Sequence, residues 1–123
     1  MPTVAVIGAS NDRSKYGNKA VRAYQQKGWT VYPINPREKE VEGLRCYASI
    51  NDTPIIPDYA SLYIPPSAIP AVLEEIAAKG TKKVYFNPGT ESDDAVAKAK
   101  ALGLKPIMAC SILAIGLDPE RMN

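Results

Sequence analysis

The sequence contains no histidine, and this absence removes several common kinds of catalysis. Without histidine the chain has no Ser-His or Cys-His dyad, no histidine-ligated zinc and no phosphohistidine intermediate of its own. It has only two cysteines, Cys46 and Cys110, which are too few for a disulfide scaffold and too far apart for a metal motif. We therefore expect a cytoplasmic protein with free thiols, no metal site and no catalytic residues.

The chain also lacks the marks of nucleic-acid and membrane proteins. Its net charge is only +2, its lysines and arginines form no large cluster, and one Trp and one Phe offer little surface for base stacking. No run reaches the roughly 18 apolar residues of a membrane span, and the first residues lead into an apolar run without a signal peptide. With 123 residues, 46% of them hydrophobic, we expect one domain over residues 1–123.

Short apolar runs alternate with helical patterns along the chain. Strands are predicted over residues 3–7, 30–34, 58–64, 83–86 and 105–108. Helices are predicted over residues 18–27, 66–79 and 91–102. Thr90 is the expected cap of the third helix, and the irregular residues 37–57 hold at most a helical turn near 47–51. The tail after Cys110 has no predicted element.

This alternation predicts a Rossmann-like α/β fold, in which helices cover both faces of a parallel sheet. We expect three layers, α/β/α, around a five-stranded sheet whose strands, numbered along the chain, lie in the order 3-2-1-4-5. Ligands of such sheets bind beyond the carboxyl ends of the strands, where helix N-termini also point. The residues that follow each strand are therefore the candidates for a site.

The first strand is followed by a run that partly matches a dinucleotide-binding fingerprint. The pattern G-x-G-x-x-G would place glycines at positions 8, 10 and 13, but the chain has Gly8, Ser10 and Arg13 there. Side-chain donors and positive charges fill the run instead, at Ser10, Asn11, Arg13, Ser14 and Lys15. With the N-terminus of the next helix they suit a phosphate or pyrophosphate. The alternative is a long polar connection that ends in a helix cap.

The second strand is followed by Asn35, Pro36 and Arg37. An NAD-binding protein usually carries Asp or Glu near this point, where it holds the ribose 2′-hydroxyl. Arginine favours a nucleotide with an extra ribose phosphate, which NADP has at the 2′ position and coenzyme A at the 3′ position. A solvent-facing arginine after a proline turn would look the same in the sequence.

Two further strand ends carry weaker signals. Pro65 and Pro66 follow the third strand and offer a flat apolar surface for an adenine, although they also suit an ordinary helix start. Asn87, Pro88 and Gly89 follow the fourth strand and suit either an anion or amide site or a capped turn. All four strand ends lie at one edge of the predicted sheet, so we expect one shared site.

In their order and spacing, four stretches of the chain resemble a known family. The resemblance lies in VIGASNDRSKYGN, VYPINPREKEVEGLRCYASI, LYIPPSAI and VYFNPGTES, which are similar to stretches of small CoA-binding proteins. These look like a stand-alone version of the N-terminal CoA-binding domain of the succinyl-CoA synthetase alpha subunit. The resemblance covers the chain from Val4 to about Cys110 and implies a Rossmann-like CoA-binding module.

The resemblance implies a role for each strand end. The glycine loop and its polar run would meet the CoA phosphates, and the N-P-[KR] stretch would lie near the ribose and its 3′-phosphate. The [VI]-P-P element would flank the adenine. The [QN]-P-G element, in which many relatives have Gln at the position of Asn87, would lie near the pantetheine arm. The binding residues implied are Gly8, Ala9, Ser10, Asn11, Arg13, Ser14, Lys15, Tyr16, Asn35, Pro36, Arg37, Ile64, Pro65, Pro66, Asn87, Pro88 and Gly89.

The synthetases use a phosphohistidine and an ATP-grasp partner, whereas this chain has no histidine and is expected to have no further domain. We therefore expect a protein that binds coenzyme A or an acyl-CoA without catalysis, and that pairs with a second copy or an acyl-CoA enzyme. The alternatives are an NADP-binding enzyme or redox sensor, and a regulatory subunit that has lost its ligand. Cys110 follows the fifth strand, where it either forms a mixed disulfide with the CoA thiol or is a small buried residue.

Overall fold

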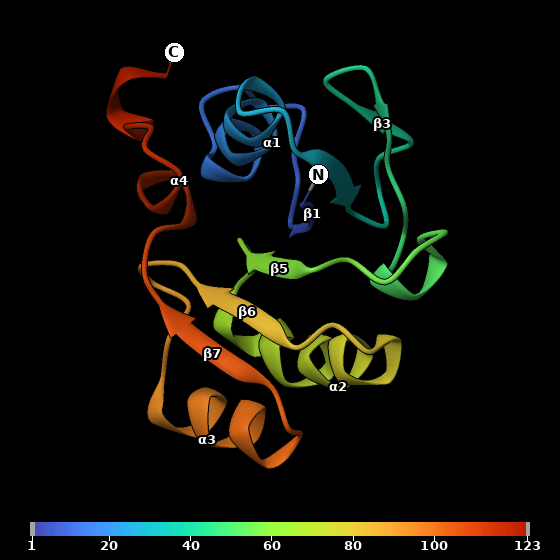
Figure 1. The fold of residues 1–123 in the computed structure, drawn as a ribbon, viewed down its shortest axis with the longest axis vertical. Helices are drawn as coiled ribbons and strands as arrows, with labels where there is room; N and C mark the ends of the chain where they lie inside the picture. The colour runs from blue at the N-terminus through green and yellow to red at the C-terminus, as the bar shows by residue number, and fades with distance from the viewer. Residues whose placement is uncertain (1, 123) are drawn as a thin grey trace.

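A five-stranded parallel sheet runs through the centre of the molecule, with helices on both of its faces (Figure 1). The computed structural model describes residues 2–122, so that Met1 and Asn123, the two ends of the predicted domain, lie outside the described residues. The strands of this sheet are β1 (Thr3–Ile7), β2 (Thr30–Ile34), β5 (Tyr59–Leu62), β6 (Lys83–Phe86) and β7 (Lys105–Met108). All neighbouring pairs are parallel, which confirms the predicted α/β fold.

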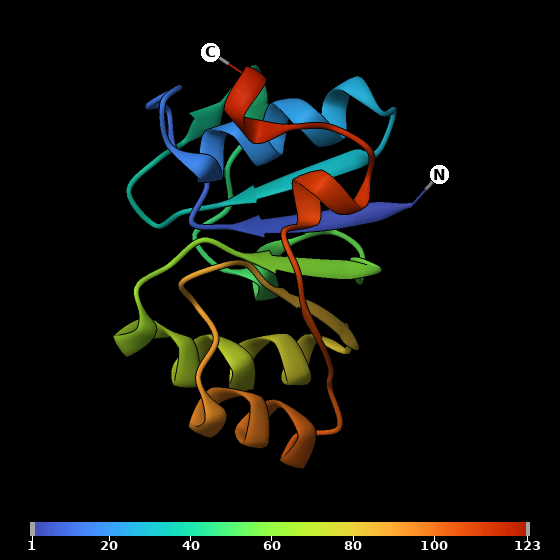
Figure 2. The ribbon, with the colours of Figure 1, turned by 90° about the vertical axis from the view of Figure 1, so that its left-hand side faces the viewer.

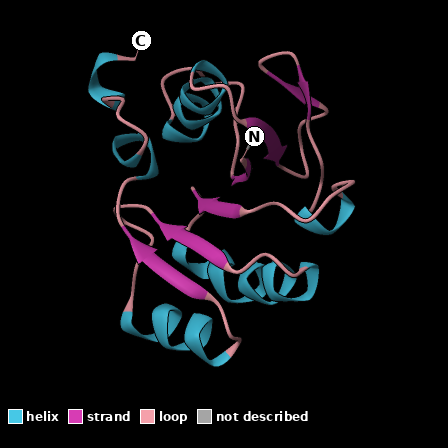
Figure 3. Ribbon diagram, viewed as in Figure 1, coloured by secondary structure: helices cyan, strands magenta, loops and turns pink. Residues whose placement is uncertain are grey.

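The helices form the two outer layers (Figures 2 and 3). They are α1 (Tyr16–Gln26), α2 (Ile69–Lys79), α3 (Asp93–Ala101) and α4 (Ser111–Ala114), with the 3-10 turns η2 (Pro66–Ala68) and η3 (Pro119–Arg121). On one face α1 packs beside the C-terminal segment that contains α4 and η3, and on the other face lie α2 and α3. None of the helices within residues 2–122 is long and apolar enough to cross a membrane.

The order of the strands, β2-β1-β5-β6-β7, differs from the predicted one. Counted along the chain it is 2-1-3-4-5, so the predicted order 3-2-1-4-5 is wrong about the place of the third strand. Strand β5 pairs with β1, with Ala5 opposite Ala60, and β2 is left at the edge of the sheet. Pro33 lies in β2, where its missing N–H is tolerated because, among the described residues, no full strand pairs with the outer side of β2, which carries only an isolated bridge between Ile34 and Tyr47.

The segment between β2 and β5 explains this order, because it carries no helix that packs beside α1. It contains a hairpin of two short strands, β3 (Glu40–Val41) and β4 (Leu44–Arg45), and the 3-10 turn η1 (Ile50–Asp52). The side chain of Ile50 is buried in the apolar cluster of α2, on the face opposite α1. The connection therefore crosses β1 on the face that α2 covers. Strand β5 then pairs with the side of β1 that faces away from β2.

Two apolar clusters, one on each face, hold the layers together. Alternate side chains of β1 point to opposite faces of the sheet. Val4 and Val6 belong to the cluster under α1, whereas Ala5 and Ile7 belong to the cluster over α2. All four are buried, so β1 lies in the core on both faces of the sheet as far as its carboxyl end at Ile7.

Several helix boundaries differ from the predicted ones, and α2 begins at Ile69 because residues 66–68 form the 3-10 turn η2. Helix α1 begins at Tyr16 rather than at residue 18. The third helix is capped by Ser92 rather than Thr90, because Ser92 Oγ accepts a hydrogen bond from the N–H of Ala95 (3.1 Å). Thr90 instead donates its hydroxyl to the carbonyl oxygen of Asn87 (2.6 Å), which tightens the turn after β6.

Candidate ligand-binding cleft

A cleft of about 1270 Å³ opens at the carboxyl ends of β1, β2, β5 and β6. It includes the topological switch point of the sheet, which lies between β1 and β5. Open α/β sheets bind their ligands at such a point. Its volume exceeds the roughly 300–1,000 Å³ of most small-ligand pockets, so it suits an extended ligand. Most of the predicted site residues line it: Gly8, Ser10, Lys15, Tyr16, Asn35, Pro36, Arg37, Ile64, Pro65, Pro66, Asn87, Pro88 and Gly89.

The loop after β1 depends on two glycines at its ends. Gly8 has a φ of +95, and a Cβ there would overlap the carbonyl oxygen of Tyr63. A Cβ at Gly17, in the first turn of α1, would overlap the carbonyl oxygen of Gly8. In G-x-G-x-x-G the first glycine makes the tight turn and the third lets the helix pack closely on the strand. Gly8 and Gly17 perform these two roles here, with Gly17 displaced four positions from the place where the fingerprint would put it.

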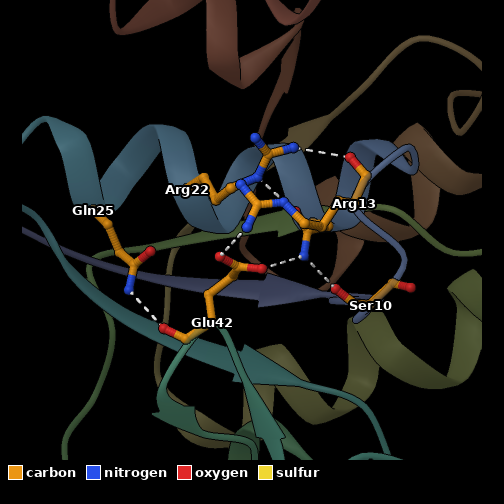
Figure 4. Close-up of polar contacts among 6 residues, drawn as sticks. Ser10, Arg13, Arg22, Gln25 and Glu42 are labelled. Atoms are coloured by element: carbon orange, nitrogen blue, oxygen red, sulfur yellow. Dashed lines mark hydrogen bonds and ion pairs between the residues drawn. The ribbon is translucent and has the colours of Figure 1, made fainter. Parts of the chain in front are cut away.

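A polar cluster, which we call the clasp, ties this loop to the tip of the β3–β4 hairpin (Figure 4). Its members are Arg13, Asn18, Arg22 and Glu42. Arg13 Nη1 lies 3.4 Å from Glu42 Oε1, and Asn18 Nδ2 donates to Glu42 Oε2 (3.1 Å). Asn18 Nδ2 also donates to the carbonyl of Ser10 (2.9 Å), and Arg22 Nη2 donates to the carbonyl of Arg13 (2.8 Å). Arg13, predicted as a phosphate ligand, therefore faces the hairpin.

The remaining predicted residues outside the cleft lining are also engaged within the fold. Asn11 donates its side-chain amide to Glu38 and to the carbonyl of Glu40. Ser14 donates its hydroxyl to the Asp12 carboxylate (2.6 Å), and this hydrogen bond lowers the pKa of Asp12. The Ala9 side chain is fully buried. These contacts shape the loop, and they leave Ser10 and Lys15 as its cleft-facing polar side chains.

Positive charge and free backbone N–H groups gather at one end of the cleft, the anion end. Lys15 caps α1 without a side-chain hydrogen bond, and within residues 2–122 the N–H groups of Tyr16 and Gly17 have no acceptor. In the same range neither the Lys15 ammonium nor the Arg37 guanidinium forms a salt bridge, and Lys15 has only a longer-range electrostatic interaction with the Asp12 carboxylate. A helix N-terminus beside unpaired cations is a favourable environment for phosphate groups.

Asn35 positions Arg37 at this end. Asn35 Oδ1 accepts a hydrogen bond from the backbone N–H of Arg37 (2.9 Å), which is a turn typical of Asn. Its Nδ2 donates to the carbonyl of Ala9 (2.8 Å), so the loops after β1 and β2 are joined. The two predicted strand-end motifs thus form one structure.

The C-terminal segment forms a wall of the cleft, of which the sequence indicates only Cys110. Cys110, Leu113, Asp118, Pro119 and Glu120 line it. Tyr16 donates its hydroxyl to Glu120 Oε1 (3.2 Å), and the negative charge of Glu120 raises the pKa of Tyr16. Two carboxylates therefore border the anion end. Cys110, one of the two free cysteines, is half-buried and lines the cleft at the start of α4, which agrees only in part with the expectation of a buried residue.

Asn87 joins the cleft floor to the C-terminal segment. Its Nδ2 donates to Ser61 Oγ (2.9 Å) and to the carbonyl of Leu62 (2.9 Å), and its Oδ1 accepts from the N–H of Ser111 (2.9 Å). The same network reaches Tyr63, whose hydroxyl lies 2.9 Å from Ser111 Oγ and whose pKa burial raises to about 12. The amide of Asn87 is thus fully used inside the protein, and its neighbours Pro88 and Gly89 form the exposed wall.

An apolar slot lies at another end of the cleft, between α2 and the segment that follows the hairpin. It is lined by Ala48, Ile50, Ala68, Val72 and Glu75. Ala68, Val72 and Glu75 are four and three residues apart, so they lie on one face of the helical segment. Pro65 and Pro66 precede this face on the cleft wall. Only one member of the slot, Glu75, carries a charge.

The strand order, the glycine-dependent loop and the cleft define a Rossmann-like α/β domain with a candidate ligand-binding cleft at the carboxyl edge of its sheet. The chain belongs to the CoA binding domain family, which matches residues 2–116. The family resemblance seen in the four strand-end stretches is thereby confirmed.

Named relatives and solved structures agree with this family. The alpha subunit of ADP-forming acetate–CoA ligase II from Pyrococcus furiosus is 39% identical over 84 residues, which are 68% of this chain and 18% of that subunit. The chain thus spans less than a fifth of that relative's length. A conserved hypothetical protein from Pyrococcus furiosus has a TM-score of 0.85 at 32% identity, covering 93% of this chain and 99% of that one. The dinucleotide-forming acetyl-coenzyme A synthetase 1 of Ca. Korarchaeum cryptofilum, solved with phosphate and ADP, has a TM-score of 0.78 at 30% identity, covering 87% of this chain and 25% of that one.

Proposed function

We propose that this chain binds coenzyme A or an acyl-CoA in the cleft and catalyses no reaction by itself. The observation that carries the proposal is the chemical division of the cleft, which has unpaired cations and free N–H groups at one end and an apolar slot at another. Coenzyme A combines a phosphate-rich nucleotide with a flat base and a long pantetheine arm, so it matches this division. The family to which the chain belongs supports the same ligand.

In this proposal each part of the cleft takes one part of the ligand. The N-terminus of α1, with Ser10 and Lys15, binds the pyrophosphate, and Arg37 binds the ribose 3′-phosphate. The adenine lies beyond Pro65 and Pro66 in the slot. The pantetheine arm runs past Pro88 and Gly89, which places the thiol on the side of the cleft that Cys110 lines.

Coenzyme A is expected to raise the Tm of the protein, because a ligand that binds only the native state stabilises it by mass action. At a concentration a hundred times its Kd, the ligand contributes about 2.7 kcal/mol. For a domain of this size that is a rise of roughly 10 °C in a thermal melt. NADPH is the comparison ligand. No rise with millimolar CoA would overturn the proposal, and a rise with NADPH alone would favour an NADP-binding protein.

Replacing Glu120 by glutamine is expected to strengthen CoA binding by roughly threefold at low salt, because it removes a negative charge beside the anion end. The gain should shrink as salt screens the charges. Isothermal titration at two salt concentrations measures both effects. Glu91→Gln makes the same charge change at an exposed position outside the cleft lining and is the control. Equal affinities for both variants would show that Glu120 does not oppose the phosphates.

A further inference from the structure

Glu75 is held in the apolar slot in a way that leaves part of its carboxylate without a partner. Its Oε1 accepts a short hydrogen bond from Ser49 Oγ (2.6 Å). Ser49 is itself fixed, because its hydroxyl oxygen caps η1 by accepting from the N–H of Asn51 (3.2 Å). Within residues 2–122 no cation pairs with Glu75, and its Oε2 accepts no hydrogen bond. An oriented carboxylate oxygen therefore remains available in the slot.

The neighbouring residue shows how unusual this arrangement is on the same helix. Glu74 points to solvent and forms an ion pair with Lys98 at 3.0 Å. Glu75 faces the cleft instead, one helical turn after Val72, where Ser49 is its hydrogen-bond donor and the other side chains of the slot are apolar. An ionised carboxylate can only accept hydrogen bonds, so a ligand group that enters the slot beside Glu75 must be a donor.

The loop that carries Arg37 also contacts the segment that leads into the slot. The backbone N–H of Asn35 donates to the carbonyl of Tyr47 (2.9 Å), so the loop that carries Arg37 runs beside the segment that begins the slot at Ala48. A nucleoside whose base occupies the slot therefore leaves its ribose near Arg37. This is the relation that a 3′-phosphorylated adenosine requires.

We propose that Glu75 selects the base of the ligand by accepting a hydrogen bond from the exocyclic amino group of adenine. The inference rests on the proposed binding of CoA and adds a residue that determines its specificity. Val72 contacts one face of the purine, and Glu75 meets its edge. A 6-oxopurine such as hypoxanthine carries a carbonyl oxygen in place of this amino group. That oxygen is a hydrogen-bond acceptor, so it cannot bond to the Glu75 carboxylate, which is also an acceptor. A site built around a donor rejects an analogue that lacks it more strongly than an apolar pocket would.

The test compares adenosine 3′,5′-bisphosphate with inosine 3′,5′-bisphosphate by isothermal titration. The native protein is expected to prefer the adenine compound by at least roughly tenfold, the discrimination typical of one hydrogen bond to a charged group. Glu75→Gln is expected to reduce this preference to within about threefold, because a glutamine amide both donates and accepts. Glu74→Gln, with the same charge change on the same helix, is the matched control and keeps the preference.

A second variant tests the positioning of the carboxylate without removing it. Ser49→Ala leaves Glu75 in place but frees it to rotate, so the preference for adenine should fall while the inosine compound binds as before. Equal binding of the two nucleotides by the native protein, or a full preference in Glu75→Gln, would overturn the inference while leaving CoA binding intact. Failure of CoA and of both nucleotides to bind the native protein would instead overturn the proposed function, and this inference with it.

Discussion

Replacing Gly17 by alanine is expected to lower the free energy of unfolding by about 2–3 kcal/mol, with a fall in Tm of roughly 10 °C. Gly17 has ordinary helical backbone in the first turn of α1, where alanine is usually favoured over glycine by about 1 kcal/mol. A Cβ there would overlap the carbonyl oxygen of Gly8, which is backbone and cannot rotate away. The helix would have to move away from the end of β1. A fall rather than a rise in the free energy of unfolding would therefore report the close contact between Gly17 and Gly8.

Thermal and urea unfolding of two variants checks the prediction. Gly103→Ala is the control, because Gly103 has a φ of +80 but a Cβ there would meet no atom within 4 Å. It tests backbone strain alone, with an expected loss of about 1 kcal/mol. If Gly17→Ala were as stable as the native protein, or less destabilised than Gly103→Ala, α1 would not approach Gly8 as closely as the structure shows.

The layers of the fold were predictable from the sequence, but the place of the third strand was not. Apolar runs such as TVAVI at residues 3–7 are marked enough to identify parallel strands. Strand order depends instead on the face that each connection crosses, and the connection between β2 and β5 has no periodic pattern. Pro33 was the available signal, because the predicted order would have put this proline in the interior of the sheet, where it would remove a hydrogen bond.

The β3–β4 hairpin was missed for two physical reasons. Its strands have two residues each, which is too short for a recognisable alternation. Its turn, Glu42 and Gly43, has positive φ at both positions, +50 and +79, and such turns usually have Asn or Asp before the glycine. The clasp depends on this hairpin, so the sequence could not show that Arg13 pairs with Glu42 instead of facing the cleft.

The cleft itself was largely predictable, because parallel strands bring their carboxyl ends to one edge whatever their order. The residues after β1, β2, β5 and β6 meet there for this reason. The C-terminal wall was not predictable, since α4 has only four residues and shows no helical period. Asp118 and Glu120 reach the cleft through the packing of this segment on α1, a contact between opposite ends of the chain.

Replacing Arg37 by glutamine is expected to weaken the binding of CoA roughly tenfold, because a charge-assisted hydrogen bond to the 3′-phosphate is lost. Binding of dephospho-CoA, which lacks this phosphate, should not change. The native protein should therefore prefer CoA to dephospho-CoA, and Arg37→Gln should bind the two about equally. Isothermal titration of both ligands against both proteins gives the four affinities, and their ratio isolates the contact between the guanidinium and the phosphate.

The ratio also separates a specific contact from the general effect of removing a positive charge. Arg45 is exposed on β4 and lies over the ring of Tyr47, outside the cleft lining, so Arg45→Gln makes the same change of net charge elsewhere. A general electrostatic effect would weaken the binding of both ligands by both variants, in proportion to the charge of each ligand. A preference for CoA that disappears in Arg37→Gln and persists in Arg45→Gln can come only from a phosphate at Arg37. If Arg37→Gln kept the full preference, another group would hold the 3′-phosphate, and the nucleotide would lie in the cleft in a different orientation.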